Sequence, residues 1–282
     1  MSTVAELLQT GRERLRAARI DHPGREAARL LGHLLGLSEP GVLARDGEPV
    51  PPEHDLRFRD LLERRSRGEP LAYLTGVREF FGRPFRVDDR VLIPRPETEH
   101  LVEACLALPL GAGTRALDVG TGSGCIAVTF ACERPGWTVL ASDLSPAAVS
   151  VATGNARRLG VGSRVLPAVA DLAEPFDLSC LDLVVANIPY VEEGTVAHLS
   201  RDVRDFEPRL ALVGGPDGLD LLRRLLDQLR SLRPGAWVAL EFGFAQEDAV
   251  LRLVESTGAF VEPVLHRDLA GIVRDVVFRR RP

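Results

Sequence analysis

The architecture of this protein follows from one segment, Arg115-Ala-Leu-Asp-Val-Gly-Thr-Gly-Ser-Gly-Cys-Ile-Ala-Val128. It begins as a short apolar strand, continues through a turn with glycine at every second position, and ends in the first turn of a helix. Such glycines let the backbone approach a ligand closely. Asp143 ends the next apolar run, close to the spacing of about 20 residues at which a carboxylate can hold ribose hydroxyls. Together these features predict a site for a nucleotide-type cofactor.

The spacing of the glycines distinguishes between two cofactors. A dinucleotide fingerprint, Gly-x-Gly-x-x-Gly, lays a pyrophosphate on a helix N-terminus, whereas this turn has the form Gly-x-Gly-x-Gly. Asp118 precedes the turn, and its carboxylate would repel a pyrophosphate but suits the cationic amino acid part of S-adenosylmethionine. We therefore expect S-adenosylmethionine rather than NAD. The residues expected to hold it in this region are Gly120, Thr121, Gly122, Ser123, Gly124 and Asp143.

A third acidic position, Asp171, closes the apolar run 164–171. Its carboxylate can accept a hydrogen bond from the amino group of adenine, while Leu172 packs on the ring. A helix cap or turn cap is the alternative interpretation of Asp171.

A second apolar run, 184–186, ends abruptly in Asn187-Ile-Pro-Tyr190. The Asn187 side chain can accept a hydrogen bond from a target NH2 group, the carbonyl of Ile188 can accept its second hydrogen, and Tyr190 can stack on the plane. This arrangement suits methylation of an amide or an exocyclic amine, although Asn and Pro also end ordinary strands. We expect Asn187, Pro189 and Tyr190 to be catalytic, the whole tetrapeptide to bind substrate, and Asn187 to contact the cofactor.

We expect no general base. The sulfonium methyl is a reactive electrophile, so holding the amide nitrogen in line with it carries much of the reaction. Glu192 and Glu193 follow the tetrapeptide, and we interpret them as a solvated loop rather than as proton acceptors.

Composition limits the possible partners. The chain has 282 residues, a net charge of -5 and 35 basic residues, all of them arginine. A protein that mainly binds nucleic acid usually has a basic surplus, so we expect no direct nucleic acid binding.

The four cysteines and six histidines show no ligand spacing, and we expect no metal. The first residues do not resemble a signal peptide and no apolar run is long enough to span a membrane, so we expect a cytoplasmic protein without a membrane partner.

Periodicity divides the chain into parts. Apolar residues recur at helical spacing in residues 4–18, 27–35 and 56–65, with a Gly- and Pro-rich loop at 37–52. We expect a helical substrate-recognition domain over 1–72 and a linker over 73–94 with a β-hairpin that turns at Gly82. Residues 95–282 form the predicted catalytic domain. There, strands alternate with helices and the motifs lie where strands end, which indicates an α/β, doubly wound, Rossmann-like sheet.

At this point the chain resembles a known family, the bacterial release factor glutamine methyltransferases of the PrmC/HemK type. The resemblance covers nearly the whole chain. It implies a class I methyltransferase sheet and transfer of a methyl group from S-adenosylmethionine to the glutamine amide in the Gly-Gly-Gln loop of class 1 peptide chain release factors. The motifs that carry it, besides 118–124 and 187–190, are Glu69-Pro-Leu-Ala-Tyr-Leu-Thr-Gly76, Leu92-Ile-Pro-Arg-Pro-Glu-Thr98, Glu207-Pro-Arg-Leu-Ala-Leu212, Gly214-Gly-Pro-Asp-Gly-Leu219 and Asp268-Leu-Ala-Gly271.

Two other functions remain open on the sequence. The same two acceptors and aromatic ring of residues 187–190 also suit the amino group of an adenine or guanine in DNA or RNA. A noncatalytic binding protein is the third interpretation, because Ile188 stands where the family usually has proline. Ile188 supplies the same carbonyl, and Pro189 still favours an extended conformation at residue 188. We therefore expect a looser but active site.

Overall fold

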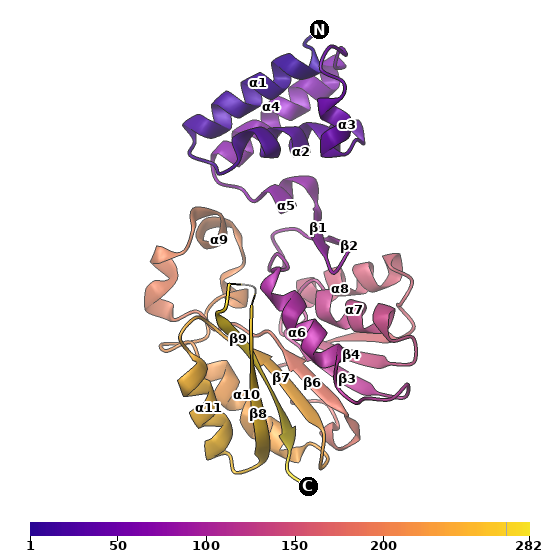
Figure 1. Ribbon diagram of the computed structural model, residues 1–282, viewed down its shortest axis with the longest axis vertical. Coiled ribbons are helices and arrows are strands. Elements are labelled where there is room, and N and C mark those ends of the chain that lie inside the picture. Colours follow the sequence, from indigo (N-terminus) through magenta and orange to yellow (C-terminus); the bar gives the residue numbers. More distant parts are fainter. Residues whose placement is uncertain (269) are drawn as a thin grey trace. The chain divides into compact units, whose positions relative to one another are not determined.

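The computed structural model describes residues 1–268 and 270–282, so Leu269, in the motif 268–271, lies outside the described residues. The chain forms two compact units (Figure 1). The first contains Met1–Val77 and Ser200–Phe206, and the second contains Arg78–Leu199 and Glu207–Pro282. Residues 78–94 of the predicted linker, which include most of its hairpin, belong to the second unit.

The first unit is a bundle of helices. Thr3 begins the first helix with a capping box, in which its hydroxyl accepts from Glu6 N at 3.3 Å and Glu6 accepts from Thr3 N at 2.8 Å. The core contains Leu15, Leu31 and Phe58, all fully buried. The helices are α1 (Val4–Ala17), α2 (Pro23–Leu35), α3 (Glu39–Leu43), α4 (Pro52–Ser66), α5 (Leu71–Thr75) and, from the later segment, α9 (Arg201–Phe206).

The prediction of a loop over 37–52 was wrong in part, because α3 lies inside it. Ser38 caps this short helix by accepting a hydrogen bond from Gly41 N at 3.2 Å, and proline stands in its first turn. Val42 then enters the core of the bundle. Five residues that include Gly and Pro are too few to show a helical period.

The predicted hairpin is present as β1 (Val77–Phe80) and β2 (Arg83–Arg86). Its turn contains Phe81 and Gly82, which both have positive φ angles, of 51° and 68°. Phe81 N donates to Glu99 Oε1 at 2.9 Å, and Phe80 and Phe85 are buried in a core of the second unit. The hairpin is thus fixed to the catalytic fold.

The second unit is built on a seven-stranded sheet in the order β5-β4-β3-β6-β7-β9-β8. The first five strands in this order are parallel, and β9 runs antiparallel to both β7 and β8. The predicted doubly wound, Rossmann-like sheet is therefore confirmed. The strands are β3 (Arg115–Val119), β4 (Thr138–Asp143), β5 (Val165–Val169), β6 (Leu183–Ala186), β7 (Trp237–Glu241), β8 (Phe260–Arg267) and β9 (Val273–Arg280).

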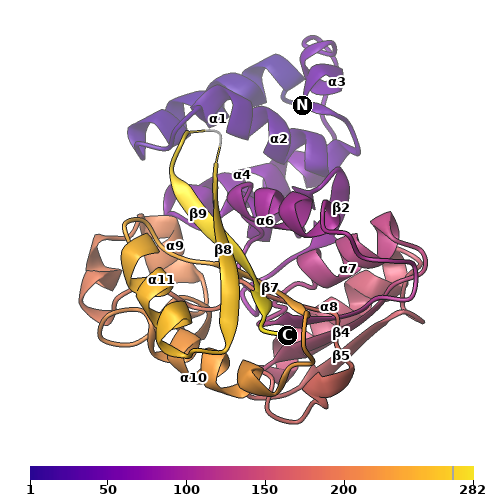
Figure 2. The same ribbon diagram turned by 60° about the horizontal axis from the view of Figure 1, so that its bottom comes forward.

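Helices cover both faces of this sheet (Figure 2). Side chains alternate along a strand, so Ala116 packs with one core while Leu117 packs with the other. The core on the Ala116 face includes α6 (Glu97–Leu106), α7 (Cys125–Glu133) and α8 (Pro146–Arg158); that on the Leu117 face includes α10 (Asp220–Gln228) and α11 (Glu247–Ser256). Short 3-10 helices occur at η1 (Leu178–Cys180), η2 (Glu193–His198), η3 (Arg209–Ala211) and η4 (Leu229–Ser231).

The strand order creates a switch point beside β3. The chain passes from β3 to β4 on one side, and later returns to β6 on the other side. The carboxyl ends of β3 and β6 are therefore neighbours, and the loops that follow them diverge. Ligands of doubly wound sheets bind in this place. No helix among the described residues is long and apolar enough to cross a membrane.

Candidate active site

A pocket lies at the carboxyl ends of the parallel strands, within the second unit. Most of the predicted site residues share its wall. Those that line it are Gly120, Gly122, Asp143, Asp171, Leu172, Asn187, Ile188 and Pro189. Four predicted residues, Thr121, Ser123, Gly124 and Tyr190, do not line it.

The glycine turn after β3 is held by the end of β4. Gly120 N and Thr121 N both donate to Ser142 O, at 2.9 and 2.8 Å. Gly120 and Gly122 have φ angles of 74° and 54°, in the region that favours glycine. A Cβ atom on Gly120 would stand 3.1 Å from Ile188 Cγ2, whereas one on Gly122 would meet only a backbone oxygen at 4.0 Å. Gly120 therefore allows close packing of the turn on residue 188, and Gly122 leaves open space over the turn.

Asp143 ends β4 and lines the pocket. Its Oδ2 accepts from Gly122 N and its Oδ1 accepts from Ser145 N, both at 2.9 Å. A carboxylate oxygen has two lone pairs, so each can accept one more hydrogen bond from a hydroxyl. Burial raises the pKa of this carboxyl group, and the two backbone donors oppose that effect.

Asp118 lies where the sequence argument did not place it. Its side chain is fully buried and does not line the pocket. Its Oδ2 accepts from the Thr121 hydroxyl at 2.6 Å and from Ala127 N at 3.1 Å, so the carboxyl group braces the turn against α7. Burial raises its pKa to about 7, and among the described residues Oδ1 has no hydrogen-bond partner. Direct contact with a cationic ligand in the pocket is therefore not its role in this structure.

Asp171 and Leu172 lie together on the pocket wall. Leu172 has a positive φ of 55° and is buried among the side chains of the core that includes α10. Asp171 Oδ2 accepts from Arg224 Nη2 at 2.7 Å, and Arg224, on α10, lines the pocket as well. The acceptor capacity of Asp171 is thus shared with an arginine that sequence reasoning did not anticipate.

The Asn187 side chain is held from one end. Its Nδ2 donates to Thr98 Oγ1 at 2.9 Å, and Thr98 Oγ1 donates to Glu241 Oε2 at 2.7 Å. No donor among the described residues bonds to Asn187 Oδ1, which leaves this oxygen available as an acceptor. Ile188 and Pro189 continue the pocket wall.

Tyr190 is anchored beside the pocket rather than on its wall. Its hydroxyl donates to Glu241 Oε1 at 3.3 Å, and its carbonyl oxygen accepts from Gln246 Nε2 at 3.1 Å. Burial is the main reason why its pKa is raised well above the usual range. The expected stacking of the ring on a substrate plane stays a prediction.

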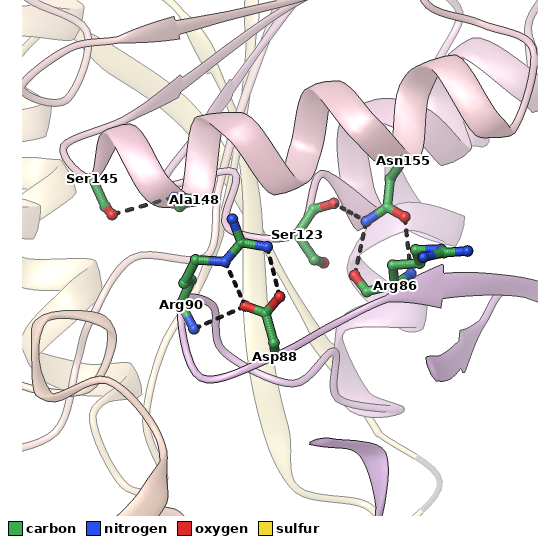
Figure 3. Close-up of polar contacts among 7 residues, drawn as sticks. All are labelled: Arg86, Asp88, Arg90, Ser123, Ser145, Ala148 and Asn155. Carbon is green, nitrogen blue, oxygen red and sulfur yellow. Dashed lines mark hydrogen bonds and ion pairs between the residues drawn. The ribbon is translucent and has the colours of Figure 1, made fainter. Parts of the chain in front are cut away.

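The far wall of the pocket comes from the segment after the hairpin, where Arg90, Val91 and Leu92 line it. Asn155 on α8 holds the last residue of β2, just before this segment (Figure 3): its Oδ1 accepts from Arg86 N, and its Nδ2 donates to Arg86 O and Ser123 O, each at 2.9 Å. Asn155 is almost fully buried, and these three bonds tie the hairpin to the glycine turn, while its Oδ1 also accepts from Arg158 Nη2 at 3.2 Å. Arg90 forms three hydrogen bonds to Asp88: two from its guanidinium group, at 2.7 and 2.6 Å, and one from its backbone N, at 3.2 Å.

Two residues of the motif 92–98, Arg95 and Thr98, also have structural partners. Arg95 Nη2 donates to Glu207 Oε1 at 2.6 Å, and Ile93 N donates to Glu207 Oε2 at 3.2 Å. Glu207 is buried, so Arg95 anchors the entry to the catalytic fold, whereas Thr98 reaches Asn187.

Pocket residues that the sequence argument missed include Leu144, Ser145, Ala148, Ala170, Pro208, Leu210, Ala211, Val213, Leu221 and Arg224. Pro208–Leu212 stood in a quoted family motif, which was the only signal for that part.

The chain is similar to known proteins over nearly its whole length. The family model described as the PrmC N-terminal domain matches residues 6–76, and the methyltransferase small domain matches residues 98–202. The release factor glutamine methyltransferase of Nitratidesulfovibrio vulgaris is 42% identical over 282 residues, which cover 99% of this chain and 96% of the relative. That of Moorella thermoacetica is 43% identical over 282 residues, 99% of each chain. A solved methyltransferase from Pyrococcus furiosus, 16% identical, has the same fold with a TM-score of 0.54 and covers 72% of this chain and 91% of its own.

Proposed function

The chain belongs to the release factor glutamine methyltransferase family, and we propose that its pocket joins S-adenosylmethionine to the glutamine of the Gly-Gly-Gln loop in class 1 release factors. The enzyme methylates the side-chain amide nitrogen of that glutamine. One observation carries the assignment to this pocket: the acceptor oxygen of Asn187 and the glycine turn after β3 belong to the same wall.

The residues of the pocket fit S-adenosylmethionine. Gly122 leaves open space over the turn, and the second lone pair of each Asp143 oxygen can accept from a ribose hydroxyl. Leu144 and Leu172 offer apolar surface for a purine ring beside Asp171. Thr121, Ser123 and Gly124 act indirectly, because they shape the turn.

When bound, S-adenosylmethionine supplies an electrophilic methyl group. The chain contributes orientation: Asn187 Oδ1 and the carbonyl of Ile188 can each accept one hydrogen of the target amide. This places the nitrogen in one position and lowers the entropic part of the barrier. Positive charge develops on the nitrogen as it attacks, and both oxygens stabilise that charge. The proton then leaves to water, so no side chain of the site is assigned as a base.

We assign recognition of the folded release factor to the first unit. Residues 6–76 match the PrmC N-terminal domain, and Leu56 on α4 exposes 72% of its surface. We expect Leu56→Asp to raise KM for intact release factor several-fold while KM for a free Gly-Gly-Gln peptide stays unchanged. Equal effects on both substrates would contradict this assignment.

A transfer assay with S-adenosylmethionine tritiated in its methyl group tests the proposal. Intact release factor, a free Gly-Gly-Gln peptide and ribosomal RNA are offered in parallel, and the labelled product is digested to locate the methyl group. We expect label on the glutamine of the release factor, less on the peptide and none on RNA. A release factor with Gly-Gly-Asn in place of Gly-Gly-Gln is the matched control and should stay unlabelled. Label on RNA alone would refute the proposal in favour of a nucleic acid substrate.

A further inference from the structure

Three side chains from distant parts of the chain form one directed series of hydrogen bonds. Thr98 lies on α6. Asn187, after β6, comes 89 residues later in the chain, and Glu241, at the end of β7, comes 143 residues after Thr98. Thr98 is 2% exposed and Glu241 is 6% exposed. Water therefore has little access to the bond between Thr98 and Glu241, and the direction of that bond is decided by the side chains themselves.

The direction follows from the number of protons. A carboxylate can only accept hydrogen bonds, and a threonine hydroxyl has a single proton to donate. Thr98 uses that proton on Glu241 Oε2, so it can only accept from Asn187. Asn187 must then turn its NH2 end toward Thr98. Its oxygen is left for the target amide, which the proposed function requires.

We propose that Glu241 is a positioning residue, which determines through Thr98 that the oxygen of the Asn187 amide, and not its NH2 group, faces the substrate. This inference rests on the proposed function. Glu241 also accepts from the Tyr190 hydroxyl through its other oxygen, at 3.3 Å. One buried carboxylate thus holds the residues at both ends of the tetrapeptide 187–190.

Protonation of Glu241 would remove this constraint. A protonated Oε2 can donate to Thr98, and Thr98 can then donate to Asn187 Oδ1, which turns the NH2 group toward the target. The NH2 groups of Asn187 and of the target amide would then face each other, and the hydrogen bond from the target to Asn187 would be lost. Burial raises the pKa of Glu241 to about 7, and the negative charges of Asp275 and Glu97 act in the same direction. The bonds from Thr98 and Tyr190 oppose the shift.

Other charged or titratable groups act on this carboxyl group or on its neighbours, among them His100, which acts on Asp275. Cys125 on α7 is buried near Glu241, and Arg95 and Arg274 act on the neighbouring Tyr190. His266 pairs with Asp275 at 2.7 Å. Glu241 orients Thr98 only when its carboxyl group has lost its proton. Because the pKa of Glu241 is about 7, the wild-type turnover should rise with pH through about 7.

Glu241→Gln tests the proposal with nearly the same shape. A glutamine can either donate to Thr98 or accept from it, so it no longer fixes the direction. We expect kcat on release factor to fall about tenfold or more, while Kd for S-adenosylhomocysteine stays within about twofold. The rise of kcat through about pH 7 should disappear in this variant. Glu255→Gln, at an exposed position of α11, is the matched control and should behave as the wild type.

Thr98 provides an independent pair of variants. Thr98→Ser keeps the hydroxyl and should retain the wild-type pH profile, whereas Thr98→Val removes the hydroxyl and should resemble Glu241→Gln. The comparison keeps the proposal testable even if Glu241→Gln does not fold. If Thr98→Val and Thr98→Ser gave the same kcat and pH profile, the hydroxyl would have no role in orientation.

The side-chain amide of Asn187 gives a readout without turnover. Its NMR signal, identified by its loss in Asn187→Ala, should change with a midpoint near pH 7 in the wild type and stay constant in Glu241→Gln. Wild-type enzyme that fails to methylate release factor would refute the proposed function itself. Active wild type, together with a Glu241→Gln variant of unchanged kcat, pH profile and NMR signal, would refute only the role of Glu241.

Discussion

Gly122 donates its backbone N-H to Asp143 Oδ2 at 2.9 Å, which ties the glycine turn after β3 to the last residue of β4. Ser145 N fills one position on the other oxygen, also at 2.9 Å. The carboxylate is thus held in place by the protein alone. Preorganisation of this kind lowers the cost of ordering a ligand group that binds to it.

Asp143→Asn should weaken cofactor binding. The amide would place an NH2 group against either Gly122 N or Ser145 N, so one backbone donor would lose its acceptor. We expect Kd for S-adenosylhomocysteine, measured by calorimetry, to rise at least about tenfold, which corresponds to about 1.4 kcal/mol. Asp227→Asn, at an exposed position of α10, serves as the control. An unchanged Kd in Asp143→Asn would remove Asp143 from the binding site.

Asn155→Ala should lower the free energy of unfolding by about 2 to 4 kcal/mol, because it leaves the buried ends of three hydrogen bonds without partners. Urea denaturation measures this loss. Asn155→Asp keeps the oxygen that accepts from Arg86 N but loses both donors, and should also be destabilised. A loss below about 0.5 kcal/mol in both variants would mean that the tie between hairpin and glycine turn contributes little.

Ile188→Pro examines the departure from the usual family tetrapeptide. Ile188 is 5% exposed, lies against Gly120 and lines the pocket, so the wild-type side chain already fills its place. We expect kcat on release factor to change by less than about tenfold, equivalent to about 1.4 kcal/mol of barrier. A larger gain in Ile188→Pro would show that isoleucine impairs the site for that substrate.

The stability of the fold should depend on pH through Asp118. Burial raises its pKa in the folded state from 3.8 to about 7, so the folded state holds this proton more tightly than the unfolded state does. Raising the pH from about 4 to about 7 therefore favours unfolding, by at most about 1.4 kcal/mol per pH unit. The unfolding free energy of the wild type, minus that of Asp118→Asn, should therefore decrease over this range, because the asparagine does not titrate. A difference that stays constant with pH would contradict the raised pKa.

Much of this fold was predictable because parallel strands are buried on both faces. The apolar runs that end at Val119, Asp143 and Ala186 all became strands, and the motifs lie at their carboxyl ends. Successive side chains of a strand point to opposite faces of the sheet, which also explains why Asp118 does not face the pocket as we expected. It shares the face of Ala116, and its carboxyl group therefore points to α7, away from the pocket. Counting along the strand would have revealed this.

Other features could not be read from the chain. Glu241 is bonded to a residue 143 positions away, and only the order of strands in the sheet brings the two together. A glutamate after an apolar run indicates a strand end, but not what its carboxyl group holds. Arg224 likewise reaches Asp171 over 53 residues. Contacts between side chains of this kind depend on tertiary packing, which local patterns do not encode.

The first compact unit takes Ser200–Phe206 from the middle of the chain, and the Arg201 side chain lies against Gly68. The polypeptide consequently passes from one unit to the other after Val77, after Leu199 and after Phe206. Neither unit can be produced whole by cutting the gene at a single place. Expression of residues 1–77 leaves out α9, and the complementary fragment carries α9 without Gly68, against which Arg201 lies, so dissecting this enzyme requires a graft of 200–206 rather than a truncation.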